Sequence, residues 1–512
     1  MYSDKKEEKI RNISYWSDTA SFQSFAPLQS DRKTEVAVLG AGMAGIISAW
    51  SLVKKGKKVI LIEAGRVANG VSAYTTGKVT SQHTLLYQDL KKSAGHKKAV
   101  QYYEANEAGL EFIHSIMEEL DIDCDWETKD AVTFATTKKG KEKIAAEIKA
   151  YQDLKINGYQ SSSIQNFPTE ITAALGSPSQ AQFHPVKFLY GVLADFLRLG
   201  GEIYEQTRAM HIDTKEGKPI VTVSTGNKLE AKEVVIATHY PINDQEGLYF
   251  SRLHVNRSYA ILGIPASPLP VGMYINAETP SRSFRSVKGE NGEEFLLIVG
   301  DGHPTGRSQE DTEIHYENLK KFAEESFGMT EILYQWSTQD PTTTDKIPYI
   351  GKMSKESDHI FVVTGFNKWG MAQGAYAGKL LTDIIMGDEN PYEKLFDPTR
   401  SLLKPLSVRT LAKENTLVGK EMLEGKITPK TKELSELAID EGGLVEIEGE
   451  LMGVYRDPEG GMHHVDPVCT HMGCTLNWNN AEKSWDCPCH GSRFGFTGDV
   501  VEGPAVKPLN KK

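Results

Sequence analysis

Cysteine is scarce in this chain of 512 residues, and its distribution is uneven. There are five cysteines, of which only Cys124 precedes residue 469, while the other four lie between residues 469 and 489. So few cysteines in so long a body exclude a disulfide scaffold. The cluster of four near the C-terminus instead predicts a metal site in a short terminal domain.

The chain also has no long run of one charge sign and no secretory signal. Its 58 Lys and Arg and 69 Asp and Glu give a formal net charge of -11, spread along the sequence. Because no basic stripe could follow a phosphate backbone, nucleic acid is not an expected partner. Residues 1–34 are charged and have no apolar core of a signal peptide, which predicts a leader segment on a cytoplasmic protein.

The longest uncharged stretch, residues 36–53, has the length of a membrane span but is interrupted by glycines. A β-branched run at 35–39, a helical segment at 43–54 and a second apolar run at 57–62 explain it better as a βαβ unit. We therefore expect no transmembrane segment.

The turn of this βαβ unit is a G-x-G-x-x-G motif, the pattern of a dinucleotide-binding fold. The first glycine permits a tight turn, the second lets the backbone approach a pyrophosphate, and the third lets helix and strand pack closely. An acid that ends the next strand can accept hydrogen bonds from ribose hydroxyls. A purely structural glycine turn is the alternative. The predicted cofactor contacts here are Gly40, Gly42, Ala44, Gly45 and Glu63.

Three later segments, 70–78, 234–239 and 360–371, resemble the flavin-contact segments of the D-amino-acid oxidase and glycine oxidase superfamily. The resemblance covers about residues 14–400 and implies an FAD-dependent oxidoreductase. Its most specific part is the last segment, Thr364-Gly-Phe-Asn-Lys-Trp-Gly-Met371, a strand that runs into a helix opened by glycine. The further flavin contacts that it implies are Ser72, Thr75, Thr76, Gly365, Asn367, Trp369, Gly370 and Met371.

The C-terminal cysteines form a C-x-H motif followed by a C-x-x-H motif. Two ligands in each of two loops is the ligand pattern of a Rieske [2Fe-2S] cluster, in which the cysteines hold one iron and the histidines the other. A tetrahedral zinc site is the alternative for the same residues. The predicted ligands are Cys469, His471, Cys487 and His490.

The extra cysteines in these loops resemble those of the cytochrome bc-type Rieske proteins, which implies a disulfide between Cys474 and Cys489. High-potential members of that family have a tyrosine where this chain has Phe494. A Rieske oxygenase is a poor alternative, because no two histidines and a carboxylate show the spacing of a mononuclear iron site.

The predicted fold is therefore α/β, a Rossmann-like FAD domain with an inserted α+β substrate domain, followed by a small all-β Rieske domain. The predicted boundaries are a leader at 1–34, an oxidoreductase body at 35–400, a helical linker at 401–436 and the Rieske domain at 437–512. Within the body, we expect FAD-binding pieces near 35–85, 180–245 and 345–395 and substrate-domain pieces near 86–179 and 246–344.

A flavin accepts two electrons and a [2Fe-2S] cluster carries one, so the fusion predicts a dehydrogenase with its own electron outlet. It would oxidise a small amine or similar substrate and exchange electrons with an unknown one-electron acceptor or donor protein. Two alternatives remain. One is a redox sensor or electron-transfer flavoprotein without turnover, and the other is an oxygen-using amine oxidase with a structural Rieske domain.

The substrate prediction depends on one position, Asp340. Glycine-oxidase-like relatives have there an arginine that binds the substrate carboxylate, and an acid cannot do so. An Asp340 that faced the flavin would favour a cationic amine. Alternatively, Asp340 is a turn residue before Pro341, and another arginine such as Arg282 or Arg285 binds the substrate.

Overall fold

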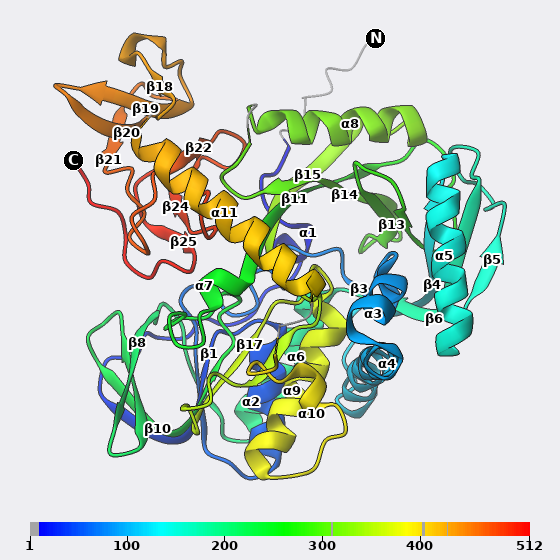
Figure 1. Cartoon of the computed structure of the whole chain (residues 1–512), viewed down its shortest axis with the longest axis horizontal. Coiled ribbons are helices and arrows are strands. Elements are labelled where there is room, and N and C mark those ends of the chain that lie inside the picture. The colour runs from blue at the N-terminus through cyan, green and yellow to red at the C-terminus, as the bar shows by residue number, and fades with distance from the viewer. Residues whose placement is uncertain (1–9, 309–310, 402–404, 428) are drawn as a thin grey trace.

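The computed structural model describes residues 10–308, 311–401, 405–427 and 429–512. The body contains two large sheets, and the C-terminal domain lies beside both of them (Figure 1). No helix within the described ranges is long and apolar enough to cross a membrane.

The nucleotide-binding sheet is built around a buried parallel core. Its strand order is β16-β17-β10-β1-β2-β7, and β8 and β9 extend it at β10. The central strand is apolar on both faces, because Val36 to Leu39 are all buried, as expected for a parallel sheet covered by helices. The strands are β1 (Arg32–Leu39), β2 (Val59–Ile62), β7 (Glu202–Tyr204), β8 (Ala209–Lys215), β9 (Lys218–Val223), β10 (Lys228–Ile236), β16 (Tyr349–Lys352) and β17 (Ile360–Thr364).

Three helices pack together against this sheet. In α2 (Met43–Lys54) every residue from Met43 to Val53 is buried, because the helix lies between β1 and two other helices, α6 (Pro185–Arg198) and α9 (Gly370–Met386). The βαβ unit predicted from the sequence is present, with the helix bounds as expected. It places the glycine turn at the carboxyl end of β1, where open α/β sheets bind ligands.

The second sheet has the order β15-β11-β14-β13-β12-β4-β6-β3, with β5 paired to β6. Helices α3 (Leu86–Ala94), α4 (His96–Glu119), α5 (Lys138–Leu154) and α8 (Glu313–Phe327) surround it (Figure 1). The strands are β3 (Lys78–Val79), β4 (Glu127–Ala135), β5 (Tyr159–Ser161), β6 (Ala173–Gln182), β11 (Leu253–Ile264), β12 (Met273–Asn276), β13 (Arg282–Lys288), β14 (Glu294–Pro304) and β15 (Glu331–Thr343).

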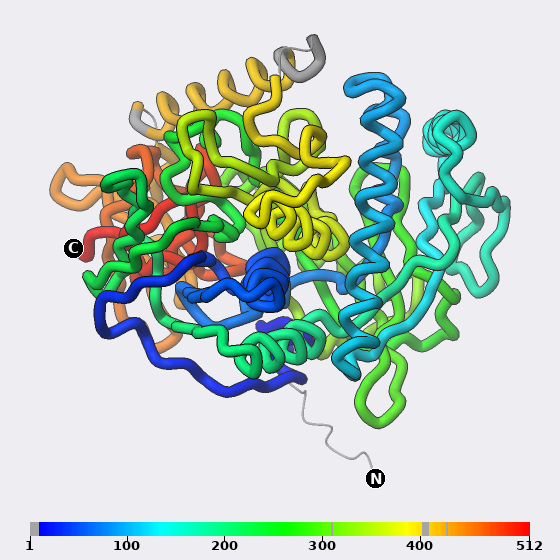
Figure 2. The backbone as a smooth tube through the Cα atoms, turned by 90° about the horizontal axis from the view of Figure 1, so that it is seen from below, coloured from blue at the N-terminus to red at the C-terminus, as the bar shows by residue number. Residues whose placement is uncertain are grey.

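The N-terminal segment packs on the body. Residues 10–31 run along the edge of the molecule (Figure 2), and Tyr15 and Trp16 of α1 (Tyr15–Asp18) are buried in the main core. The predicted leader boundary at residue 34 falls inside β1, because Arg32 to Thr34 pair with β10. Residues 1–9 of that predicted leader lie outside the described ranges.

A long helix leads into the C-terminal domain. After the short helix α10 (Glu393–Phe396), α11 (Pro405–Ile427) crosses the front of the molecule toward that domain (Figure 1). Pairing of β18 with β19 starts at Thr431, inside the predicted linker. The domain has two four-stranded sheets, β18 (Thr431–Lys432), β19 (Glu441–Ile447), β20 (Glu450–Arg456) and β21 (Met462–Val465), and β22 (Asn477–Asn479), β23 (Ser484–Asp486), β24 (Arg493–Gly495) and β25 (Val500–Glu502).

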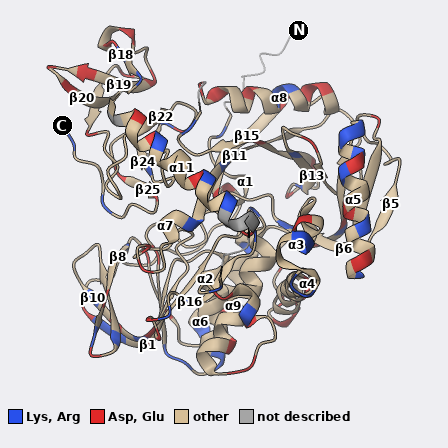
Figure 3. Cartoon of the chain, in the orientation of Figure 1, with Lys and Arg blue, Asp and Glu red and all other residues tan. Residues whose placement is uncertain are grey.

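Charges of both signs alternate on the exposed helices. Lys, Arg, Asp and Glu are interspersed along α5, α8 and α11 (Figure 3). This distribution matches the even spread of charge along the sequence and favours solubility.

Candidate functional site

The glycine turn after β1 leaves no room for side chains. A Cβ on Gly40, whose φ is +99°, would lie 2.5 Å from the Ala237 carbonyl oxygen, and one on Gly45 would lie 1.9 Å from the Gly40 carbonyl oxygen. A Cβ on Gly42 would approach Ser72 Oγ to 3.0 Å. The turn therefore brings bare backbone to the N-terminus of α2, the geometry that suits a pyrophosphate.

Glu63 and Ser72 hold this turn in place. Glu63 accepts hydrogen bonds from the amides of Ala41 and Gly65, each at 2.8 Å, and burial raises the pKa of Glu63. Ser72 Oγ accepts from the Met43 amide at 2.9 Å, at the start of α2. Both side chains were predicted cofactor contacts, and here they shape the turn.

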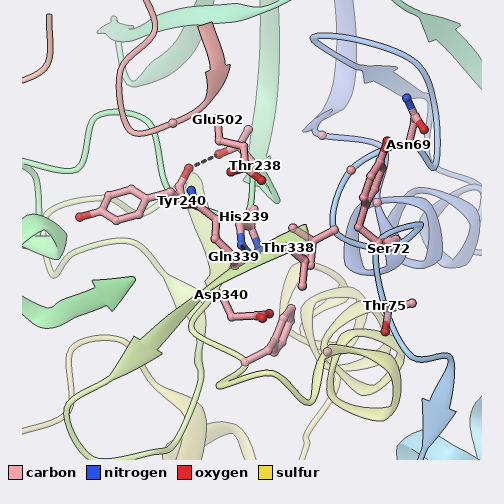
Figure 4. Close-up of a pocket in the computed structure, with 18 of the residues that line it drawn as sticks. Asn69, Ser72, Thr75, Thr238, His239, Tyr240, Thr338, Gln339, Asp340 and Glu502 are labelled. Atoms are coloured by element: carbon pink, nitrogen blue, oxygen red, sulfur yellow. Dashed lines mark hydrogen bonds between the residues drawn. The ribbon is translucent and has the colours of Figure 1, made fainter. Parts of the chain in front are cut away.

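A cavity of about 950 Å³ extends from the glycine turn to the second sheet. It is large enough for a dinucleotide-sized ligand by the usual dimensions of cofactor sites. Figure 4 shows side chains from several elements pointing into it, among them Ser72, Thr75, His239 and Asp340. The predicted site residues that line the cavity are Gly40, Gly42, Ala44, Glu63, Ser72, Thr75, Thr76, Asp340, Trp369, Gly370 and Met371.

Three predicted flavin contacts, Gly45, Gly365 and Asn367, are not among the described residues that line the cavity. Gly45 lets α2 approach the turn, as described above. Asn367 Oδ1 accepts from the Thr343 amide at 3.0 Å, and Asn367 Nδ2 donates to the Lys346 carbonyl at 3.1 Å. The asparagine therefore ties the loop before α9 to the end of β15, which positions the neighbouring residues that do line the cavity.

Asp340 is a strand residue and is buried. It lies inside β15, opposite Asn256 of β11, so the alternative of a turn residue does not describe its backbone. Burial raises the pKa of Asp340, while His239 and Lys368 oppose that rise. Its carboxyl group lines the cavity and belongs to the wall formed by the second sheet.

The two arginines weighed as alternatives are engaged elsewhere. Arg282 forms an ion pair with Asp301 at 2.8 Å. Arg285 donates to the backbone carbonyls of Thr76 and Ser286 and lies over the Trp16 ring. Neither residue lines the cavity.

Sequence reasoning missed a cation in the same cavity. Lys368 follows Asn367 in the loop before α9, and Lys368 Nζ donates to Ser258 Oγ at 2.7 Å. Burial lowers the pKa of Lys368, although Asp340 opposes that effect. The sequence signal that could have identified Lys368 is its position in segment 360–371, the segment that most resembles the flavin oxidases.

The C-terminal domain supplies part of the cavity wall, which no sequence signal indicated. Glu502, Arg493 and Ser484 line the cavity together with residues of the body. Arg493 donates to Glu502 Oε2 at 3.0 Å and to Asp486 Oδ1 at 3.1 Å, so its charge is balanced within its own domain.

The predicted cluster ligands converge in two buried loops of the C-terminal domain. Cys469 and Cys487 are both buried with free thiols, and the neighbouring Cys487 side chain lowers the pKa of Cys469. The rings of His471 and His490 are nearly perpendicular, with centroids 5.1 Å apart. Both histidines have a buried Nδ1 without a hydrogen-bond partner.

Two thiols and two unpartnered imidazole nitrogens fit the donor set of a Rieske cluster. The buried Nδ1 atoms are the strongest sign, because buried polar atoms are nearly always paired when their ligand is present. The cavity likewise fits FAD. Its wall includes the glycine turn at the N-terminus of α2, where a Cβ would obstruct the approach of a pyrophosphate to the backbone.

The predicted disulfide between Cys474 and Cys489 is confirmed, with an S–S distance of 1.99 Å. It joins the two ligand loops. The sulfurs of Cys474, Cys487 and Cys489 lie within 4.8 Å of one another, but the two in the disulfide are not available as thiolate ligands.

The cluster loops face the body of the molecule. His471 Nε2 donates to Asp244 Oδ2 at 3.0 Å, and the His490 ring lies 6.0 Å from that of Phe250. A Cβ on Gly306 would lie 2.7 Å from the Pro488 nitrogen. The domains therefore touch directly at the ligand loops.

Comparison with known proteins agrees with these two sites. Residues 35–384 match the FAD dependent oxidoreductase family (DAO), and residues 429–511 match the Rieske [2Fe-2S] domain. A Bacillus subtilis (strain 168) protein named as a Rieske 2Fe-2S iron-sulfur protein, YhfW, is 40% identical over 499 residues, which are 97% of each chain.

Two further relatives match about three quarters of this chain. Gamma-glutamylputrescine oxidoreductase from Escherichia coli (strain K12) is 22% identical over 401 residues, 74% of this chain and 90% of the relative. The structure of glycine oxidase from Geobacillus kaustophilus superposes with a TM-score of 0.61 at 18% identity, over 72% of this chain and 99% of the other. The chain therefore belongs to the DAO family of FAD-dependent oxidoreductases and has a C-terminal Rieske [2Fe-2S] domain.

Proposed function

We propose that the protein is a dehydrogenase of a small amine and that electrons pass from its flavin to its Rieske cluster. The observation that carries this proposal is the docking of the ligand loops against the flavin body. The side chain of His471 is 8% exposed and residue His490 is 6% exposed, so both are covered, and Asp244 and Phe250 of the body contact them. A cluster that faced only an outside partner would not need this arrangement.

The wall shared by the two sites supports electron transfer between them. Tyr240 lines the flavin cavity, is buried, and lies close enough to Asp244 and Cys487 for their charges to raise its pKa further. One side chain thus lies beside both sites. When bound, FAD supplies a two-electron acceptor and the cluster supplies a one-electron carrier.

The charges of the cavity support a cationic substrate. Asp340 would bind an ammonium group by a charge-assisted hydrogen bond, and this buried residue lines the cavity. Gamma-glutamylputrescine oxidoreductase, whose name describes an amine substrate, is a relative over most of the body. Both observations favour amines.

A second candidate substrate is an amino acid. Lys368 lines the same cavity and can bind a carboxylate while Asp340 binds the ammonium group. Oxidation of a simple amine would depend on Asp340, whereas oxidation of an amino acid would also depend on Lys368. Substitutions at these two positions therefore distinguish the two substrate classes.

The test is anaerobic mixing of the purified holoprotein with amines, diamines, glycine, D-alanine and sarcosine, with the flavin absorbance followed in time. We expect amines to bleach the flavin of the wild type and Asp340→Asn to slow them. Asp213→Asn, an exposed aspartate on β8, is the control. Rapid bleaching by the amino acids, slowed in Asp340→Asn and lost in Lys368→Met, would establish the second candidate instead.

The same mixing tests the two remaining alternatives. If no compound of a broad panel bleached the flavin, an electron-transfer flavoprotein or sensor without turnover would be favoured. If bleaching occurred and peroxide formed in air while the cluster stayed oxidised, an oxygen-using oxidase with a structural Rieske domain would be favoured.

A further inference from the structure

We propose that Asp244, a residue of the flavin body, is the positioning residue for cluster ligand His471 and holds the reduction potential of the Rieske cluster down. The inference depends on the cluster being present, but not on the flavin being its electron donor. It assigns a role in the cluster to a residue outside the Rieske domain.

The contact is specific and buried. Asp244 Oδ2 lies 3.0 Å from His471 Nε2, and both side chains are 8% exposed. A carboxylate only accepts, so Nε2 carries the proton and donates it. That choice leaves His471 Nδ1 without a proton and free to bind iron, and it is the nitrogen that has no partner in the protein.

The loop that bears Asp244 is fixed by its own contacts. The Asp244 carbonyl accepts from the Tyr249 amide at 2.8 Å, which closes the turn that leads into α7 (Tyr249–Arg252). Asn243, the preceding residue, is anchored to the backbone of Ile212 in β8 by two side-chain hydrogen bonds. These hydrogen bonds hold the backbone on both sides of the Asp244 carboxylate in place.

The sign of the effect follows from charge. A carboxylate that accepts from the outer nitrogen of a metal-bound imidazole makes that imidazole a stronger electron donor. Reduction adds negative charge to the cluster, and a nearby buried negative charge opposes it because the local dielectric is low. The hydrogen bond therefore stabilises the oxidised cluster and lowers the potential.

The contact also couples the potential to docking. Asp244 and His471 are 227 positions apart in sequence and belong to different domains. The hydrogen bond exists only while the Rieske domain is seated on the body, so the docked cluster has a lower potential than an undocked one.

The test is a redox titration of the holoprotein, followed by EPR and by the cluster absorbance. We expect Asp244→Asn to shift the reduction equilibrium at least tenfold toward the reduced cluster, which is about 59 mV for one electron, and to change the g values. Asp244→Glu should keep the potential near that of the wild type. If the amide variant loads too little cluster, Asp244→Ala makes the same comparison.

Two controls separate this role from general damage to the interface. Glu246→Gln removes an exposed negative charge from the same loop. Tyr316→Phe removes the hydrogen bond of 2.7 Å to Glu482, a contact between the domains away from the ligands. Both should leave the potential unchanged. An unchanged potential and EPR signal in Asp244→Asn and Asp244→Ala, or an equal shift in either control, would overturn the proposal.

Discussion

At the scale of single residues, Phe494 occupies the position of a tyrosine in high-potential bc-type Rieske proteins. Its side chain is fully buried in the core that contains Cys469 and Cys487. A phenyl ring cannot donate a hydrogen bond to a cluster sulfur, and such bonds stabilise the reduced state. We expect Phe494→Tyr to raise the potential in a redox titration, and Phe496→Tyr, two residues on and partly exposed, to leave it unchanged. A reduction potential that is unchanged or lower in Phe494→Tyr would contradict this expectation.

Asp340 makes a prediction about pH. Burial raises the pKa of Asp340 above its ordinary value of 3.8, so the carboxylate that binds an ammonium group is protonated as the pH falls through that raised value. We expect kcat/KM for an amine to decline on the acid side in the wild type, and this decline to be absent in Asp340→Asn. That variant loses a charge-assisted hydrogen bond of about 1.5–3 kcal/mol, roughly a tenfold to hundredfold rise in KM at neutral pH. If kcat/KM declined equally on the acid side in the wild type and in Asp340→Asn, the titrating group would be one other than Asp340.

The residues that sequence could predict are those with a local pattern. The glycines of the turn and the four cluster ligands have spacings set by one loop or two, so the positions of Gly40 and Cys469 could be read from their neighbours. Asp244 and Glu502 have no such pattern. They matter because two domains meet there, and contact between distant segments leaves no periodicity in either of them.

At the scale of elements, the close contact of α2 with the glycine turn leads to a prediction about FAD. An alanine at 45 would place its Cβ 1.9 Å from the Gly40 carbonyl oxygen, so the turn or the helix must move. We expect Gly45→Ala to purify with much less FAD per chain and with its iron unchanged. Gly419→Ala, a helix glycine with open space around it, should retain FAD fully. Full FAD content in Gly45→Ala would contradict the pyrophosphate site.

The elements themselves show where sequence prediction succeeded and where it did not. The helical segment predicted at 43–54 is α2, with the same bounds. The boundary placed at residue 34 falls within β1, because the charged residues Arg32 to Thr34 pair with β10 at the solvent-exposed end of that strand. Charge alone therefore did not mark the end of the segment.

At the scale of the whole molecule, docking of the Rieske domain depends on close backbone contact. Gly306 has a φ of +70°, and a Cβ there would lie 2.7 Å from the Pro488 nitrogen and 2.8 Å from the Cys487 carbonyl carbon. We expect Gly306→Ala to slow electron transfer from flavin to cluster in rapid-mixing experiments, while the rate of flavin reduction by substrate is retained. Gly226→Ala, which has a φ of +85° and no neighbouring atom within 4 Å, controls for backbone strain. Equal transfer rates in both variants would show that docking at this point is not needed.

In the function proposed above, substrate electrons leave the flavin through the cluster of the same chain. The most direct measurement is anaerobic rapid mixing of the holoprotein with a reducing amine, in which flavin absorbance is followed optically and the cluster by freeze-quench EPR. We expect the flavin to bleach first and the reduced Rieske signal then to appear at a rate independent of protein concentration. A flavin that bleaches fully while the cluster stays oxidised, or a cluster signal whose rate rises with protein concentration, would contradict it.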